Sequence, residues 1–86
     1  MVKVEFDEHF KRAISKIKDA SIRDRVEKLI LKLIFKIRDN PEIGKPMRHN
    51  RKGTKELYLS SFRLSYAYNK VSGVIVILNF YHKDEQ

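Results

Sequence analysis

The stretch GTKELYLSSFRLSYAY, residues 53–68, alternates apolar and polar side chains on both sides of a central Ser-Ser pair. A period of two residues is typical of β-strands, whose successive side chains point to opposite faces. The stretch therefore predicts a β-hairpin with one apolar face. The side chains expected on that face are Leu57, Leu59, Phe62, Leu64, Tyr66 and Tyr68. The opposite face should carry Glu56, Tyr58 and Arg63, so these polar groups need not be buried.

Two further strands are expected, one on each side of the hairpin in the sequence. The segment VIVILNFY, residues 74–81, is apolar without alternation, which is typical of a central strand covered on both faces. A turn at residues 69–73 should connect it to the hairpin. Near the start of the chain, VKVEF, residues 2–6, alternates apolar and charged residues and predicts a half-buried strand.

Two helices are expected between the first strand and the hairpin. Asp7 is placed to cap the first helix, and residues 10–17 supply apolar side chains at helical spacing. Ser21 and Asp24 form a pattern like a capping box at the start of the second helix. This helix should end at Asn40-Pro41, because proline excludes the preceding residue from the helical region. Its apolar stripe comprises Ile22, Val26, Leu29, Ile30, Leu33 and Ile37.

These elements predict a single domain, residues 1–86, of the α+β class. The expected order is β-α-α-β-β-β, with a helical hairpin packed on one face of a mostly antiparallel, twisted sheet. A chain of 86 residues is too short to divide its apolar surface between two cores. The segment between residues 41 and 54 has no periodicity and contains prolines and glycines, so it is expected to be a loop.

The net positive charge of the chain indicates which kinds of partner it is expected to bind. Its 19 lysines and arginines exceed its 11 acidic residues, and a net charge of +8 attracts nucleic acid, an anionic membrane or an acidic protein. The chain has no cysteine and its three histidines are scattered, so neither a metal site nor a cofactor is expected. The absence of a signal peptide and of a membrane-spanning apolar run predicts a cytoplasmic protein without a membrane partner.

The expected loop before the hairpin is strongly basic. Its cations could hold phosphate groups of RNA, or they could simply keep the loop solvated. We take phosphate binding as the working interpretation because the whole chain is basic. The candidate RNA-binding residues are Lys45, Arg48, Arg51, Lys52 and Lys55.

The uncovered hairpin face and the end of the last strand should bring several chemically useful side chains together. RNA cleavage requires removal of the 2′-hydroxyl proton, stabilisation of charge on phosphorus and protonation of the leaving oxygen. An arginine fork matches two phosphate oxygens, a histidine exchanges protons near neutral pH, and a glutamate or tyrosine can activate or orient the nucleophile. The candidate catalytic residues are Arg63, His82, Lys83, Tyr58 and Glu56. Alternatively, Arg63 and Glu56 form a structural ion pair across the hairpin.

The second helix carries cations and two apolar residues outside its main stripe. Leu31 and Phe35 could form a patch that receives an amphipathic helix of a partner, or they could belong to a broad core stripe. The cations could meet nucleic acid or an acidic partner, or remain solvated. They are Arg25, Lys28, Lys32 and Lys36.

The order of these segments resembles the RelE/ParE superfamily, the toxins of type II toxin–antitoxin pairs. The resemblance is carried by ELYL (56–59), FRLSY (62–66) and VIVILNFYHK (74–83), with KPMR (45–48) in the place of the family's basic loop. The resemblance extends over nearly the whole chain, and the residues around the hairpin look most like those of archaeal RelE-type members. Glu56 and Tyr58 depart from the pattern, since they stand where well-known bacterial toxins carry two lysines.

The resemblance implies a toxin that inhibits translation by cleaving mRNA in the ribosomal A site. Arg63 would stabilise the transition-state phosphate, and His82 or Lys83 would act on the leaving group. Glu56 would be the candidate base, while Tyr58 would stack on a base or orient the nucleophile. The implied partners are the ribosome, mRNA and an acidic, RelB-like antitoxin. The candidate antitoxin contacts are Leu31, Phe35, Lys28 and Lys32.

Two other functions fit the same residues. A ParE-like inhibitor of DNA gyrase would share the fold but lack the ribonuclease residues, and the two missing lysines are consistent with it. A non-enzymatic RNA-binding protein would need only the basic loop and the uncovered sheet face.

Overall fold

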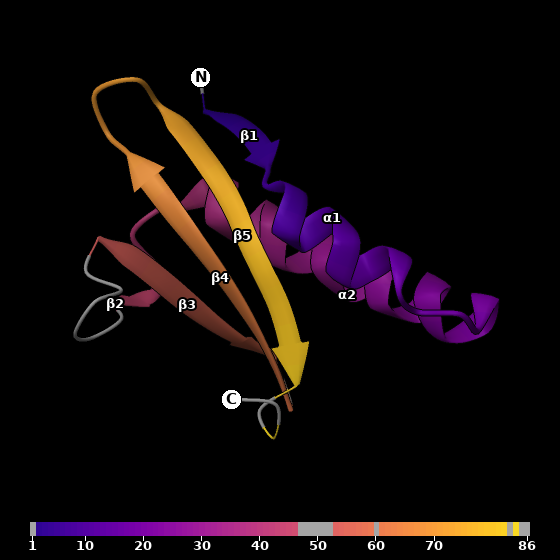
Figure 1. Cartoon of the computed structure of the whole chain (residues 1–86). Coiled ribbons are helices and arrows are strands. Elements are labelled where there is room, and N and C mark those ends of the chain that lie inside the picture. Colours follow the sequence, from indigo (N-terminus) through magenta and orange to yellow (C-terminus); the bar gives the residue numbers. More distant parts are fainter. Residues whose placement is uncertain (1, 47–52, 60, 83, 85–86) are drawn as a thin grey trace.

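One mixed sheet with a helix pair on one face forms the domain (Figure 1). The computed structural model describes residues 2–46, 53–59, 61–82 and 84. Its elements are β1 (Lys3–Phe6), α1 (Glu8–Ser15), α2 (Ala20–Asp39), β2 (Lys45–Pro46), β3 (Thr54–Leu59), β4 (Phe62–Asn69) and β5 (Val74–His82). The strand order is β1-β5-β4-β3-β2. β1 runs parallel to β5, and the other neighbours are antiparallel. The predicted α+β class is confirmed, with β2 as an additional short strand.

The hairpin formed by β3 and β4 has the predicted register. Leu57 pairs with Leu64 and Tyr58 pairs with Arg63, so apolar and polar pairs alternate along the two strands. Leu64 and Tyr66 are fully buried beneath the helices, while Leu57 and Phe62 are partly buried against the core. The side chain of Leu59 lies outside what the structure describes. The sheet face opposite the helices is called the open face below.

β5 is covered on one face only, which corrects the expectation of a strand buried on both. Ile75 and Ile77 are fully buried against the helices, whereas Val74 and Val76 are half-buried on the open face. The long apolar run of residues 74–81 predicted a strand covered on both faces. Both helices, however, lie on the same side of the sheet (Figure 1).

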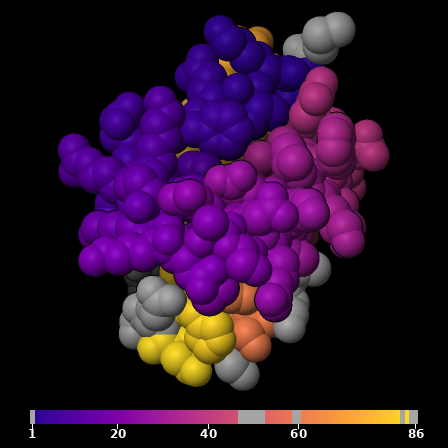
Figure 2. Space-filling view, turned by 90° about the vertical axis from the view of Figure 1, so that its right-hand side faces the viewer, coloured from indigo at the N-terminus to yellow at the C-terminus, as the bar shows by residue number. Residues whose placement is uncertain are grey.

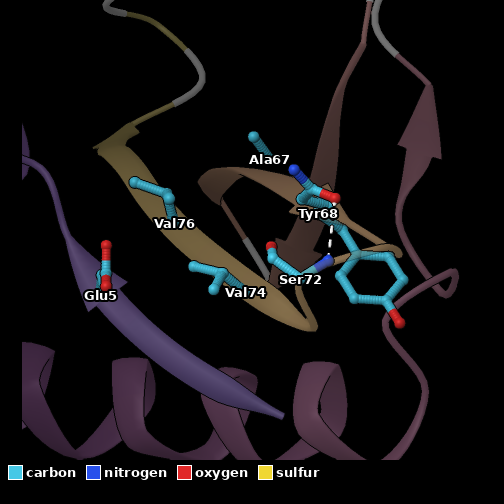
Figure 3. A pocket seen from close by; sticks show the side chains of 7 residues that line it. Glu5, Ala67, Tyr68, Ser72, Val74 and Val76 are labelled. Atoms are coloured by element: carbon cyan, nitrogen blue, oxygen red, sulfur yellow. Dashed lines mark hydrogen bonds between the residues drawn. The ribbon is translucent and has the colours of Figure 1, made fainter.

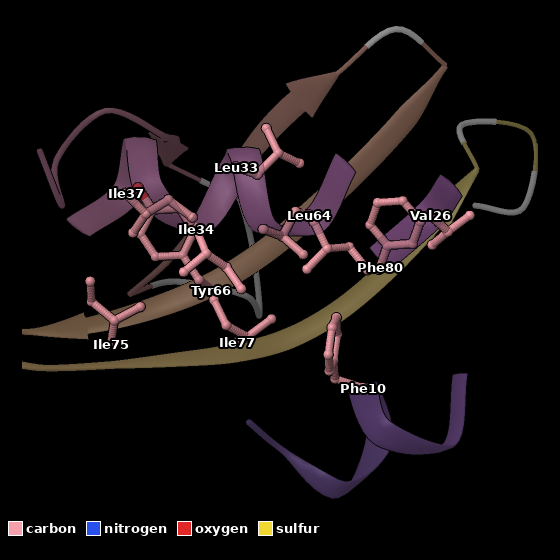
Figure 4. Close-up of a cluster of buried hydrophobic side chains, with 11 residues drawn as sticks. Phe10, Val26, Leu33, Ile34, Ile37, Leu64, Tyr66, Ile75, Ile77 and Phe80 are labelled. Atoms are coloured by element: carbon pink, nitrogen blue, oxygen red, sulfur yellow. The ribbon is translucent and has the colours of Figure 1, made fainter. Parts of the chain in front are cut away.

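The core lies between the helices and β4 and β5 (Figure 4). Its buried apolar side chains are Phe10, Val26, Ile30, Leu33, Ile34, Ile37, Leu64, Tyr66, Ile75, Ile77 and Phe80. Ile22 was expected in the apolar stripe but is 50% exposed, because the first turns of α2 project past the sheet (Figure 1). Leu29 is only half-buried, and Ile34 lies in the core instead. Seen from the side on which the helices project, the helices form the front surface, with the end of β5, in yellow, below them (Figure 2).

The first helix cap is confirmed and the second is corrected. The Asp7 carboxylate accepts the backbone N–H of His9 at 2.9 Å, as predicted. The second helix is capped by Asp19 rather than Ser21, because the Asp19 carboxylate accepts the N–H groups of Ser21 and Ile22 at 2.8 and 3.1 Å. α2 ends at Asp39, as the Asn40-Pro41 pair predicted, whereas α1 ends at Ser15 and leaves Ile17 outside the helix. None of the described helices is long and apolar enough to cross a membrane.

Removing the Asp19 cap should destabilise the protein measurably. Asp19→Ala leaves two first-turn N–H groups without their carboxylate partner, and we expect the free energy of unfolding to fall by about 1 kcal/mol. Ser21→Ala is the matched control and should change it by less than about 0.5 kcal/mol. Urea denaturation of the two variants measures both values. A larger loss for Ser21→Ala than for Asp19→Ala would restore the capping-box interpretation.

Candidate nucleic-acid interface

Three side chains lie in a row across the open face. Arg63 on β4 pairs with Tyr58 on β3 and with Tyr81 on β5, so all three project from the sheet away from the helices. The Arg63 guanidinium lies over the ring of Tyr58, with Cζ 3.8 Å from the ring centroid. Tyr58 is 45% exposed and Arg63 is half-buried. The predicted position of these two residues on the uncovered face is confirmed.

A second cation reaches the same aromatic ring from the other side of β3. Lys45 lies on β2, and its ammonium nitrogen is 5.2 Å from the Tyr58 ring centroid. Since β2 and β4 flank β3, Lys45 and Arg63 approach Tyr58 from neighbouring strands on opposite sides. The negative ring face attracts both cations, by about 0.5–1 kcal/mol each at an exposed site. Two positive groups therefore contact the same ring on the open face, an arrangement suited to phosphate oxygens.

The hydroxyl of Tyr66 anchors the segment that carries Lys45. It accepts the N–H of Gly44 and donates to the carbonyl of Pro41, both at 2.9 Å. The ring of Tyr66 is fully buried, and this burial raises the pKa of its hydroxyl, which therefore remains a proton donor. Tyr66 was predicted in the core from the alternation, but its contact with the segment before β2 was not.

Glu56 does not pair with Arg63. Glu56 is 6% exposed, and its carboxylate accepts a hydrogen bond from the Tyr81 hydroxyl. Within the described residues, no ion pair joins Glu56 to Arg63, so the alternative of a structural ion pair across the hairpin is wrong. Tyr81 was missed because it lies in an apolar run that carries no alternation of its own.

His82 lies on the opposite face of the sheet from Arg63. It pairs with Phe62, and the two rings meet edge to face with centroids 5.4 Å apart. Phe62 in turn stacks on the core residue Phe80 at 5.0 Å. The Nδ1 atom of His82 accepts the N–H of Asp84 at 3.2 Å. The expected convergence of His82 with Arg63 is therefore not observed, and Lys83 lies outside the described residues.

A β-bulge explains the position of His82. Before it, Ala67 pairs with Val76 and Tyr66 with Ile77; after it, Ser65 pairs with Asn79 and Arg63 with Tyr81. The even-numbered residues of β5 face outward before this irregularity and the odd-numbered residues after it. Because the side-chain period is two, one additional residue exchanges the two faces of the strand. Simple alternation from Val76 would place Phe80 and His82 on the open face. Because of the bulge, Tyr81 faces that side instead.

The predicted basic loop is brought to this site only in part. Lys45 contacts Tyr58, as described above. Lys55 pairs with Tyr66 and is half-buried on the helix-covered side of the sheet. Arg48, Arg51 and Lys52 lie outside the described residues.

No protein-family model matches the sequence, and no curated protein matches it either. Solved structures do. A chain of the RelBE2 toxin–antitoxin complex from Mycobacterium tuberculosis superposes with a TM-score of 0.78 at 24% identity, over 94% of this chain and 96% of that chain. This is the fold of the RelE/ParE toxins.

Two further structures share this RelE-like fold at lower sequence identity. The intact E. coli RelBE toxin–antitoxin complex has a TM-score of 0.65 at 17% identity, over 95% of this chain and 96% of that chain. The YoeB/ParE toxin from Agrobacterium tumefaciens has a TM-score of 0.70 at 12% identity, over 94% and 98%. The predicted architecture is thus confirmed over nearly the whole chain.

The helix layer of the RelE-like fold exposes the two apolar residues outside the α2 stripe. Leu31 is 53% and Phe35 is 60% exposed, so neither belongs to a broad core stripe. Lys28 lies near them and pairs with Asp24 at 3.2 Å, while Lys32 is exposed. The four candidate antitoxin contacts thus share one solvent-facing helix surface.

A hollow of about 310 Å³ lies at the other end of the open face (Figure 3). Val74, Val76 and Ala67 line it, and Glu5 stands at its β1 side. Ala67 is four positions along β4 from Arg63, about 13 Å for an extended strand, so the hollow is separate from the Arg63 site. No group of three or more His, Cys, Asp or Glu side chains that could hold a metal ion occurs among the described residues.

Proposed function

We propose that this chain is the toxin of a type II toxin–antitoxin pair and that it cleaves messenger RNA on the ribosome. The observation that carries the proposal is the Arg63 guanidinium, held on the bare sheet face against the Tyr58 ring, which Lys45 of β2 also approaches. The RelE-like fold and the net charge of +8 support it.

Arg63 is proposed to bind the scissile phosphate. Its planar fork can donate two parallel hydrogen bonds to the non-bridging oxygens, whose negative charge grows as the 2′-hydroxyl attacks phosphorus. Lys45 is proposed to hold a phosphate oxygen as a point charge. Tyr58 contacts both cations, so we assign it to orienting them in preference to stacking on a base.

Glu56 is the proposed general base. It lies on the same open-face side of β3 as Tyr58, and the Tyr81 hydroxyl binds one of its carboxylate oxygens. Once this hydrogen bond opens or the second oxygen is used, the carboxylate can take the proton of the 2′-hydroxyl as the O2′–P bond forms and the P–O5′ bond breaks. The leaving 5′-oxygen then takes its proton from water. The described part of the chain offers no histidine on this face in its place, since His82 lies on the other side of the sheet.

Glu56→Gln tests the role of this carboxylate. Glutamine keeps the size and a hydrogen-bond acceptor for Tyr81 but cannot accept a proton, so we expect cleavage to fall by about 10²–10⁴-fold. Ribosome binding should stay within a few fold. The measurement is cleavage of a defined mRNA on programmed ribosomes. Cleavage near the wild-type rate, together with tighter RNA binding, would show that Glu56 only places a repulsive charge beside the phosphate site.

The positions of Glu56 and His82 are also compatible with a function that does not involve catalysis. A ParE-like gyrase inhibitor or a non-enzymatic RNA binder needs no acid or base, and here the candidate base is buried while the histidine is on the other face. The purified chain should therefore be assayed on programmed ribosomes and on DNA gyrase in parallel. Intact mRNA together with blocked supercoiling would replace the ribonuclease proposal with the gyrase one, and intact mRNA with unaffected gyrase would favour RNA binding alone.

The proposed protein partner is an acidic antitoxin. Two of the similar structures are toxin–antitoxin complexes, which supports the assignment. The α2 surface around Leu31 and Phe35, with Lys28 and Lys32 beside it, combines exposed apolar area with positive charge. An amphipathic helix with an acidic rim complements such a surface.

A further inference from the structure

The chain between α2 and β2 is held at two points. At the start of this segment, the backbone carbonyl of Asn40 accepts the N–H of Ile43 at 3.0 Å. The side-chain oxygen of Asn40 accepts the N–H of Glu42 at 3.3 Å. At its end, the Gly44 N–H donates to the Tyr66 hydroxyl. Tyr66 thus fixes the backbone one residue before Lys45.

Gly44 lies so close to Tyr66 that a side chain has no space there. A Cβ atom at this position would be 2.7 Å from the Tyr66 hydroxyl oxygen and 2.8 Å from its Cε1 atom. It would also be 3.0 Å from the Cβ of Lys55. The backbone therefore packs directly on the Tyr66 ring, and the hydrogen bond forms with almost no freedom in the position of Gly44.

β2 has little else to define its position. It is two residues long, and its pairing with β3 consists of Lys45 opposite Glu56 and Pro46 opposite Lys55. Proline has no N–H to donate to the sheet. The Lys45 side chain is exposed but sits 5.2 Å from the Tyr58 ring centroid. The place of this ammonium therefore depends on the anchored backbone that precedes it.

We propose that Tyr66 is a positioning residue for RNA binding: its buried hydroxyl holds Gly44, and thereby keeps the Lys45 ammonium beside the Tyr58 ring on the open face, where it contacts an RNA phosphate. This inference rests on the proposed function, because it takes RNA as the ligand of Lys45. Tyr66 itself is on the helix-covered side of β4 and acts only through the chain of contacts from Gly44 to Lys45.

The hydroxyl of Tyr66 can be removed without removing the ring. Tyr66→Phe keeps the buried aromatic side chain and deletes both hydrogen bonds to residues 41–44. Tyr68→Phe is the matched control: it lies two positions along the same strand, packs against the same core, and its hydroxyl takes part in none of the hydrogen bonds within the described residues. Lys45→Met removes the proposed phosphate contact and keeps much of the side chain.

The experiment measures binding of a fluorescent 12-nucleotide uridine RNA to the full chain at several salt concentrations. Each lost phosphate contact lowers the slope of log K against log salt by about 0.7 for single strands. We expect this loss, with affinity about tenfold weaker at low salt, for Lys45→Met and for Tyr66→Phe. The double variant should match Lys45→Met alone, because both changes remove the same contact. Tyr68→Phe should bind as the wild type does.

Two results overturn the inference in distinguishable ways. If Lys45→Met lowers the slope but Tyr66→Phe retains the wild-type slope, Lys45 binds phosphate without help from Tyr66. If Lys45→Met itself retains the wild-type slope, the RNA contact in the proposed function is wrong and the role of Tyr66 falls with it. If Tyr66→Phe does not fold, Gly44→Ala takes its place, since its methyl group pushes the segment away from an intact Tyr66. A wild-type slope for Gly44→Ala then overturns the inference.

Discussion

Arg63→Ala should lower the rate of ribosome-dependent mRNA cleavage by about 10²–10³-fold and leave ribosome binding within a few fold. The guanidinium stands over the Tyr58 ring on the open face, where its charge can meet the negative charge that develops on phosphorus. An interaction that is stronger in the transition state than in the ground state affects the rate more than binding. The measurement is single-turnover cleavage of a defined mRNA on programmed ribosomes, with ribosome binding followed by co-sedimentation.

Two variants separate the effect of this arginine from that of net charge. Arg12→Ala removes the same charge from an exposed position on α1, and cleavage should remain within about twofold of the wild type. Arg63→Lys keeps the charge but loses the two-pronged donor, and we expect an intermediate loss of about tenfold. Equal losses for Arg12→Ala and Arg63→Ala would mean that the protein only needs positive charge, which contradicts a catalytic role for Arg63.

Leu33→Ala should lower the free energy of unfolding by about 2–5 kcal/mol. Leu33 lies on α2 and is 0% exposed, so its removal leaves a cavity in the core. The close-packed side chains around it relax only partly into that cavity, so most of the loss remains. Urea denaturation at neutral pH measures the change.

Leu31→Ala is the matched control for this truncation. Leu31 lies two positions earlier on the same helix but is more than half exposed, so its truncation should change the free energy of unfolding by about 0.5 kcal/mol or less. The same chemical change is thus compared on two faces of α2. Similar losses for Leu31→Ala and Leu33→Ala would show that α2 presents a different face to the sheet.

The sequence alone was sufficient for the hairpin and for the position of Arg63. The alternation from Glu56 to Tyr68 specifies which side chains share a face, and the register of β3 and β4 agrees with it. Asp7 and Asn40-Pro41 marked helix ends correctly, since capping and the restriction before proline depend only on local geometry. Asp19 was missed because Ser21 with Asp24 three positions later resembles a capping box, whereas the Asp19 carboxylate accepts the N–H groups of Ser21 and Ile22.

Contacts between distant segments decided the rest of the site. β2 has only two residues, so its sequence shows no periodicity that could predict it. Its pairing with β3 nevertheless brings Lys45 to Tyr58, which is 13 positions later in the chain. The hydroxyl of Tyr66 holds that segment from 22 positions away from Gly44. Such pairings depend on where the chain returns after a loop, which no local pattern encodes.

The alternation in the sequence by itself determined the two faces of the hairpin, because the backbone geometry of a strand sends neighbouring side chains to opposite sides. Only the tertiary structure decided which side chain of β5 joins Arg63. The bulge between β4 and β5 adds one residue to β5, which turns Tyr81 toward the open face and His82 toward the core. That exchange depends on the pairing of two strands, so the sequence of either strand alone does not contain it.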